Sequence, residues 1–248
     1  MIWGTTLDKK ITLEPAFVIH TRAFRETSLI ADLFTRNHGK LSVIAKGARR
    51  PKSKLKVIQT PSSLFSLSCL GKSELKTLID CEITEYFDPS PESYNCLVYL
   101  NELLSKLLAK EDAHEKIFDQ YLSVCRFLKE ADKDELEINL RMFELTLLEE
   151  IGYGLDFINE ASSKKKIREL STYKFDPTLG FLPLLESDVV TDKSHFSGKD
   201  ILNFSKGNLE NTDSRKASKQ IMRQALDFHL GSKSLKIREY LSKKGVQG

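Results

Sequence analysis

The sequence predicts an α+β protein in which a strand-rich first part is followed by a helical second part. Residues 1–82 contain short β-rich runs separated by turn residues. From about residue 91 onward, apolar residues recur with the period of an α-helix. Hydrophobic residues make up 40% of the 248 residues, which is enough to bury a core. We therefore expect a strand-rich domain over 1–82 and a helical domain over 83–248.

Short strands are expected throughout the first domain. Their apolar and β-branched residues are bounded by turn signals such as Gly39 and Gly71. Strands at this spacing favour a small barrel or sandwich, and closure into a barrel would remove exposed strand edges. The runs that predict them are 16–20, 29–34, 40–45, 64–70 and 75–80.

The second domain is expected to be a helical bundle with one irregular segment. Ser90 has the features of a helix N-cap, and Pro91 suits the first helical position. Amphipathic spacing then predicts three helices with short connections. Residues 155–195 show no regular period and are expected to form a small irregular lobe. The predicted helices begin near residues 91, 117 and 134, and two more cover about 214–230 and 235–242.

Nothing in the sequence points to catalysis, to a metal or to a membrane. The five histidines are isolated, and the nucleophile-elbow, phosphate-loop and zinc-protease patterns are absent. Because the cysteines lack zinc-site spacing, we expect free thiols, no metal and no cofactor. No apolar run reaches the length of a membrane span, and no secretory signal is recognised, so we expect a cytoplasmic protein. The cysteines are Cys69, Cys81, Cys96 and Cys125.

Charge is strongly segregated along the chain. Residues 33–73 contain nine lysines and arginines and no carboxylate, whereas residues 74–160 contain eight bases and 21 acids. Residues 206–248 are basic again, with ten bases and four acids. A block of one sign attracts a polyanion, and nucleic acid is the commonest one in a cytosol. The alternative is that the basic block docks on the acidic middle of its own chain.

The densest basic cluster runs from Lys46 to Lys54 and contains Gly47, Pro51 and Ser53. Lysine and arginine neutralise backbone phosphates and release counterions, and serine can add a neutral phosphate contact. Phe24 and Phe34 could stack on unpaired bases or could equally be core residues. This cluster does not distinguish DNA from RNA.

Several ordered motifs resemble one bacterial family. The segments 16–22, 25–29 and 45–49, followed by Tyr99–Leu104, Gly152–Gly154 and Leu230–Gly231, are similar to those of the RecO recombination mediators. The resemblance implies an N-terminal OB-fold β-barrel, which is the nucleic-acid-binding domain, and a helical domain with a small irregular C-terminal lobe. Since no cysteine follows Gly152–Phe157, the chain resembles the zinc-free branch.

The resemblance also implies a function without catalysis. Such proteins bind single- and double-stranded DNA and anneal complementary strands. With RecR they help RecA load onto DNA coated with the single-strand binding protein SSB, during recombinational gap repair. We would then expect a nucleoid-associated protein in the cytoplasm.

Two sets of site residues follow from charge and from the resemblance. The expected DNA surface comprises Arg22, Arg25, Lys40, Lys46, Arg49, Arg50, Lys52, Lys54 and Lys56, with Arg215, Lys216, Lys219 and Arg223 as a second contact. The expected site for the acidic SSB tail comprises Arg141, Phe118, Tyr121, Leu122, Leu145 and Leu148. Arg141 could instead pair with Glu137 or Glu144. An RNA-binding OB module without a repair role, and a nucleic-acid-modifying enzyme, remain as alternatives.

Overall fold

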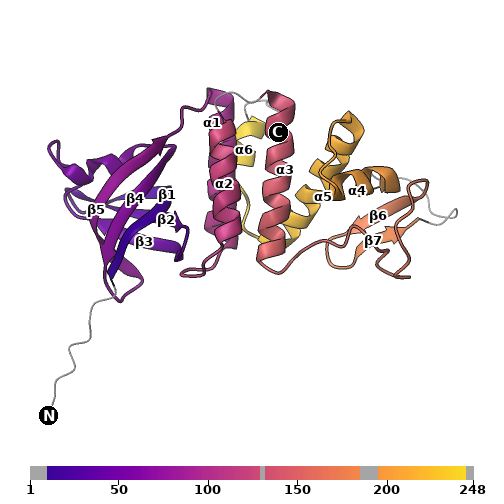
Figure 1. The fold of residues 1–248 in the computed structure, drawn as a ribbon, viewed down its shortest axis with the longest axis horizontal. Coiled ribbons are helices and arrows are strands. Elements are labelled where there is room, and N and C mark those ends of the chain that lie inside the picture. The colour runs from indigo at the N-terminus through magenta and orange to yellow at the C-terminus, as the bar shows by residue number, and fades with distance from the viewer. Residues whose placement is uncertain (1–9, 129–131, 185–194, 244–248) are drawn as a thin grey trace, which may run out of the picture. The chain divides into compact units, whose positions relative to one another are not determined.

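A computed structural model of the chain describes residues 10–128, 132–184 and 195–243 (Figure 1). The chain forms two compact units. The first contains residues 1–130 together with 235–248, and the second contains residues 131–234. The α+β class is confirmed: five strands precede helices α1–α3, and a small second sheet lies between α3 and α4 along the chain. None of the helices in the described ranges combines the length and hydrophobicity needed to cross a membrane.

The first unit begins with a closed five-stranded barrel in the order β1-β2-β3-β5-β4, as expected for an OB-fold. Strands β3 and β5 are parallel, and the other pairs are antiparallel. The strands, indigo to purple in Figure 1, are β1 (Lys10–Phe24), β2 (Ser28–Thr35), β3 (Gly39–Ala45), β4 (Ser63–Leu70) and β5 (Leu75–Tyr86).

Alternation of side chains fills the barrel. In β3 and β4 every second residue is buried, and Val43, Phe65 and Leu67 meet in the core. Strand β1 is long enough to pair with β4 through its first half and with β2 through its second half. A register shift between Val18 and His20 marks a bulge, the usual device for bending a strand around a barrel. The short 3-10 helix η1 (Lys54–Gln59) adds Ile58 to the core.

Helices α1 (Pro91–Leu107), α2 (Glu115–Phe127) and α6 (Lys236–Lys243) complete the first unit. The Ser90 hydroxyl accepts a hydrogen bond from the Ser93 amide at 3.2 Å, which confirms the expected N-cap of α1. The Glu102 carboxylate accepts from the first amides of α6, Lys236 and Ile237. The boundary at residue 82 stays a prediction, since α1 and α2 belong to the same compact unit as the barrel.

The second unit contains helices and a small sheet. The elements are α3 (Lys133–Glu150), β6 (Thr172–Asp176), β7 (Gly180–Pro183), β8 (His195–Ser197), α4 (Gly198–Ser205) and α5 (Thr212–Leu230). The expected irregular lobe over 155–195 contains β6 and β7 of the antiparallel sheet β7-β6-β8, and β8 begins at its last residue. Residues 185–194 of the lobe lie outside the described ranges. Strands of three to five residues are too short to show a period of two, which explains why the sequence did not predict them.

Candidate nucleic-acid interface

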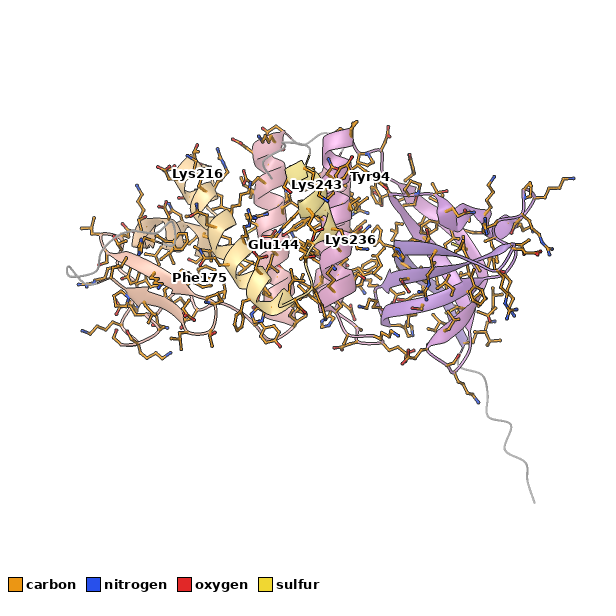
Figure 2. All side chains as sticks on the ribbon, turned by 180° about the vertical axis from the view of Figure 1, so that it is seen from behind. Tyr94, Glu144, Phe175, Lys216, Lys236 and Lys243 are labelled. Atoms are coloured by element: carbon orange, nitrogen blue, oxygen red, sulfur yellow. The ribbon has the colours of Figure 1, made fainter. Side chains whose placement is uncertain are left out.

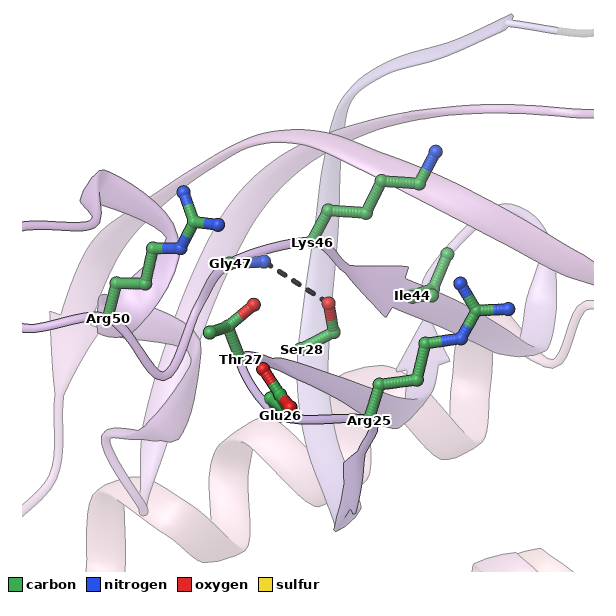
Figure 3. A pocket seen from close by; sticks show the side chains of 8 residues that line it. All are labelled: Arg25, Glu26, Thr27, Ser28, Ile44, Lys46, Gly47 and Arg50. Carbon is green, nitrogen blue, oxygen red and sulfur yellow. Dashed lines mark hydrogen bonds between the residues drawn. The ribbon is translucent and has the colours of Figure 1, made fainter.

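An open hollow of about 620 Å³ lies at one end of the barrel, where the turn between β1 and β2 meets the loop after β3. Arg25 projects from the turn, and Lys46 and Arg50 project from the loop. Figure 3 shows these three side chains extending to the same side of the hollow. Thr27 and Ser28 supply hydroxyl groups between them. The hollow therefore presents cations and neutral donors together, a combination suited to phosphate oxygens.

Hydrogen bonds fix the loop to the turn. The Gly47 amide donates to the Ser28 hydroxyl at 3.3 Å (Figure 3), and the Arg49 amide donates to the Thr27 carbonyl at 2.9 Å. Ala48, between them, is completely buried. Gly47 has a φ of +70°, a conformation that glycine adopts without strain. The cations are thus carried by backbone that is ordered before any ligand arrives.

Arg49 contributes to the same attachment through its side chain. Its Nη1 donates to the carbonyl oxygens of Arg25 and Glu26, at 3.3 and 3.2 Å. The sequence predicted Arg49 only as a phosphate contact. Its bonds to the turn were not foreseeable, because the acceptors are backbone carbonyls more than twenty residues earlier in the chain.

The loop after β3 and helix η1 carry six exposed cations, here called the loop cations. They are Lys46, Arg49, Arg50, Lys52, Lys54 and Lys56. In the described ranges none of them forms an ion pair. Arg22 and Arg25 on the neighbouring strand and turn are also exposed. Their charges are available to an external anion.

Lys40, expected on the same surface, lies elsewhere. It sits near the start of β3, whereas Lys46 follows the end of that strand, so the two are separated by about 20 Å of extended chain. Its Nζ donates to the Ser105 carbonyl of α1 at 2.5 Å, and its own carbonyl accepts from the Glu111 amide at 3.0 Å. Lys40 therefore contacts the helices at the opposite end of the strand from the loop cations.

Arg36 shows that the basic block does dock on the chain's own acids, but only in part. Its guanidinium makes two hydrogen bonds of 3.1 Å to Asp119 and an ion pair of 2.8 Å to Glu115, both on α2. The hydrogen bond and charge of Asp119 raise the pKa of Arg36. Internal docking thus accounts for Arg36, while the loop cations stay exposed.

The C-terminal basic residues are divided in the same way. Arg215 of α5 forms an ion pair of 2.8 Å with Asp134 of α3 and donates to the carbonyls of Leu209 and Glu210. Lys219 lies 3.9 Å from Glu137 of α3, and burial lowers the pKa of Lys219. These two side chains hold α5 to α3.

The other two C-terminal cations of the expected second contact face solvent. Arg223 is exposed and lies 4.0 Å from Asp227, one turn later on α5. Lys216 is exposed and makes no ion pair with any described residue (Figure 2). Only these two side chains of the set are open to a ligand.

The aromatic residues expected to bind the SSB tail are core residues of the first unit. The Phe118 ring of α2 lies 5.2 Å from the Phe17 ring and 5.4 Å from the Phe34 ring, and the Tyr121 ring lies 4.6 Å from that of Phe17. Phe118 and Tyr121 are each 1% exposed, so they do not offer an open wall. Phe34 is completely buried, which settles its role as core rather than stacking surface.

Arg141 pairs with Glu144, one of the two partners that the sequence left open. Its Nη2 donates to the Glu144 carboxylate at 2.7 Å, and both side chains are buried. Leu148 is also buried, whereas Leu145 and Leu122 are half-buried. Arg141, Leu145 and Leu148 belong to the second compact unit, and Leu122 belongs to the first.

The cysteines are free thiols in the structure, and three of the four are buried. Burial raises the pKa of the Cys81 thiol to about 12. Over residues 10–128, 132–184 and 195–243, no cluster of three or more His, Cys, Asp or Glu side chains is arranged to hold a metal ion.

Comparison with known proteins matches both parts of the chain to one family. The family model described as "Recombination protein O N terminal" matches residues 10–87, and that described as "Recombination protein O C terminal" matches residues 89–239. A DNA repair protein RecO from Proteus mirabilis is 38% identical over 226 residues, covering 90% of this chain and 89% of that protein. The protein of the same name from Coxiella burnetii is 36% identical, with 95% and 100% covered.

A further relative from Polynucleobacter asymbioticus, also named DNA repair protein RecO, is 37% identical over 243 residues, 94% of this chain and 96% of the relative. The similarity thus spans the barrel, the helices and the second unit alike. The resemblance of the ordered motifs is confirmed: this chain belongs to the RecO family of DNA repair proteins.

Proposed function

We propose that this protein binds single- and double-stranded DNA through its loop cations and anneals complementary strands. The observation that carries the proposal is the group of six exposed cations, without ion pairs in the described ranges, on a loop fixed to the β1–β2 turn. A pre-ordered cationic loop loses little conformational entropy when it binds a phosphate backbone.

Annealing requires that two polyanions approach each other. Each strand repels the other until its charge is neutralised, and bound lysine and arginine side chains replace the condensed counterions. Phosphate contacts carry no sequence information, so one surface serves any pair of complementary strands. No covalent bond is made or broken in the protein or the DNA, so the proposal needs neither a catalytic group nor a nucleotide.

We place this activity in recombinational gap repair. With RecR, the protein would help RecA load onto DNA coated with SSB, acting in the cytoplasm at the nucleoid. Support comes from family membership, because the relatives are named DNA repair proteins, and from the motifs that resemble the RecO mediators.

The contact with the SSB tail is part of the same proposal, with Arg141 as its cation. An acidic peptide tail needs a cation beside apolar side chains, and Leu145 is a half-buried neighbour on α3. Arg141→Ala alone would leave the buried Glu144 carboxylate without its cation, which would destabilise the fold. The double variant Arg141→Ala/Glu144→Ala removes both charges and is therefore tested beside the single variant. We expect both variants to lose affinity for a tail peptide. Full affinity in the folded double variant would clear Arg141 of the role.

The direct test of DNA binding compares matched charge reversals. Lys46→Glu/Arg50→Glu should weaken binding to a single-stranded oligonucleotide and slow annealing of complementary strands. The control Lys174→Glu reverses an exposed cation on β6 of the second unit and should change neither. Log affinity of the unaltered protein should fall with log salt by about 0.7–0.9 for each phosphate contacted, and the double variant should show a shallower slope.

Three outcomes would oppose the proposal. A flat salt response would mean that phosphates are not the ligand. Unchanged annealing by Lys46→Glu/Arg50→Glu would clear the loop of the role. Equal or tighter binding of RNA, with no annealing of DNA, would favour an RNA-binding module instead.

A further inference from the structure

The second unit contains a separate hollow of about 380 Å³ that the barrel surface does not account for. It lies between the turn that follows α3, the turn between β6 and β7, and the end of α5. Large apolar side chains line it in an exposed state: Tyr153 is 50% exposed, Phe228 is 53% exposed and Leu179 is 63% exposed. Such a patch on a surface is typical of a binding site.

The aromatic rings in the hollow are arranged as a platform. The Tyr153 and His229 rings are stacked, with centroids 3.9 Å apart and planes 21° apart. The Phe228 ring stands against His229 edge-on, at 5.1 Å and 82°. Burial lowers the pKa of His229, which favours the uncharged imidazole in this stack. The half-exposed Tyr153 leaves room for a further planar ring.

A rigid basic hairpin borders this platform. Lys164 lines the hollow, and Lys165, Lys166 and Arg168 follow it, all of them exposed. In the described ranges none of these four cations forms an ion pair. Of these four, Lys164 lines the hollow and so places its charge beside the stacked rings.

The hairpin is held in place by the buried carboxylate of Glu160. This group accepts hydrogen bonds from the Ser163 and Tyr173 hydroxyls, and the Glu160 amide donates to the Lys165 carbonyl at 2.7 Å. The lysines therefore project from ordered backbone, which reduces the entropy that an anion would have to offset on binding.

One acid, Asp156, is among the residues that line the hollow, and its charge is already engaged. Its carboxylate accepts from the Ile158 amide at 2.9 Å, the Asn159 amide at 3.0 Å and the Asn159 side chain at 3.1 Å. Burial opposes the charge of this group, but these hydrogen bonds, together with the positive charge of Lys164, outweigh it and lower the pKa of Asp156. The Asp156 carboxylate thus stabilises its own loop. The positive charge of Lys164 offsets the repulsion between this carboxylate and a phosphate in the hollow.

We propose that this hollow binds unpaired bases of single-stranded DNA, with a base stacked on Tyr153 and its phosphate beside Lys164. Exposed rings next to cations are the combination that single-strand-binding surfaces use, because every base has a face that can stack. An apolar peptide would use the rings but not the Lys164 ammonium group beside them. The inference rests on the proposed function only in taking DNA as the ligand, since its residues are distinct from the loop cations.

The site would also give the proposed annealing activity a physical basis. A barrel surface that binds through phosphates does not distinguish paired from unpaired DNA, whereas a stacking ring needs a base that is out of the duplex. A protein that holds unpaired bases would keep one strand open for its complement.

The test measures binding of a thymidine oligonucleotide, with an abasic oligonucleotide of equal length as the control probe. We expect Tyr153→Ala to weaken binding of the thymidine oligonucleotide at least about fivefold. Binding of the abasic oligonucleotide should be unchanged, and Tyr153→Phe, which keeps the ring, should bind like the unaltered protein. Wild-type affinity of Tyr153→Ala for the thymidine oligonucleotide would overturn the inference. So would equal losses for both probes, because stacking would then not be the cause.

A fluorescent variant separates DNA from a peptide as the occupant. Tyr153→Trp combined with Trp3→Phe leaves one tryptophan, at the proposed stacking position. We expect the thymidine oligonucleotide to quench its emission. Quenching by a phenylalanine-containing peptide, with none by the oligonucleotide, would overturn the inference.

The two proposals fail in different ways. Loss of binding in Lys46→Glu/Arg50→Glu, with none in Tyr153→Ala, would retain the barrel surface and exclude the hollow. The reverse pattern would exclude the barrel surface and support the hollow.

Discussion

The guanidinium of Arg49 donates a hydrogen bond to the carbonyl oxygen of Arg25, 3.3 Å away, and through the same nitrogen reaches the carbonyl of Glu26. Arg25 itself has a φ of +52°, a conformation that costs a residue with a side chain about 1–2 kcal/mol. The bonds from Arg49 offset part of that cost and fix the direction in which Arg25 leaves the turn. Arg49 is therefore a positioning residue as well as a charge.

This geometry predicts that Arg49 and Arg50 differ when charge is conserved. Arg49→Lys keeps the cation but shortens the side chain and removes the Nη1 group that donates to both carbonyls. Arg50→Lys alters a side chain that lines the hollow and makes no hydrogen bond to the described residues of the turn. We expect Arg49→Lys to weaken oligonucleotide binding several-fold and Arg50→Lys to change it little, in titrations at fixed salt. Identical affinities for the two variants would contradict a positioning role.

A second prediction separates cations that hold the fold from cations that face DNA. Arg36→Ala removes the bonds to Asp119 and Glu115 and should lower the Tm while leaving oligonucleotide affinity close to wild type. Lys46 forms no ion pair with any described residue, so Lys46→Ala should weaken oligonucleotide binding while leaving the Tm close to wild type. Melting curves and binding titrations on the same two proteins check this. A drop in affinity for Arg36→Ala at unchanged Tm would reverse the assignment.

Much of the fold was predictable because its signals are local. Strands such as β4 alternate over eight residues, and helices such as α3 repeat apolar residues over several turns, so each pattern is long enough to read. The sheet β7-β6-β8 was missed because its strands are too short for that. Assignment of the barrel to an OB-fold needed the family resemblance, since alternation alone leaves a sandwich open.

The candidate site was predictable only as a block of charge. From the sequence alone, every lysine and arginine counts as one positive charge available to a ligand. In the structure, Arg36 pairs with Asp119 of α2 and Arg215 pairs with Asp134 of α3, each about eighty residues away along the chain. Lys40 is close to Lys46 along the chain but lies at the opposite end of strand β3. Phe118 and Tyr121 belong to an apolar stripe at helical spacing, and the sequence pattern of such a stripe is the same whether it packs in a core or lines a binding pocket.

A third prediction uses that aromatic core. Phe34 is completely buried between β2 and α2, so Phe34→Ala should lower the free energy of unfolding by about 3–5 kcal/mol. Phe24 is half-buried, with the Arg25 guanidinium 5.3 Å from its ring, and Phe24→Ala should cost clearly less. Urea denaturation of both variants measures this difference. Equal losses would mean that the Phe34 ring is not packed as described.

A fourth prediction compares two glycines that share a left-handed backbone. Gly39 has a φ of +65° and Gly47 a φ of +70°. A Cβ on Gly39 would lie 1.9 Å from the Asp112 carbonyl oxygen, whereas the nearest atom to a Cβ on Gly47 is 3.7 Å away. Gly47→Ala should therefore cost only the backbone strain of about 1–2 kcal/mol. Gly39→Ala should cost considerably more in urea denaturation, because the loop between α1 and α2 must move. Similar costs would show that this loop does not pack against Gly39.

The last prediction concerns pH and His229. Burial lowers the pKa of this imidazole in the folded protein below the ordinary value of 6.5, so the unfolded chain binds the proton more readily. Stability rises with pH wherever the unfolded state binds more protons, so the contribution of His229 is complete above about pH 6.5 and is lost as the pH falls through the folded pKa. We expect the unfolding free energy to decrease as pH falls from 7.5 to about 5.5, and His229→Phe to decrease less. The variant keeps a ring to stack on Tyr153, and the other histidines remain in both proteins, so the difference between the two curves isolates this group. Parallel pH profiles of unfolding free energy for the two proteins would show that the pKa of His229 is the same in the folded and unfolded states. That result would contradict an uncharged His229 in the stack with Tyr153.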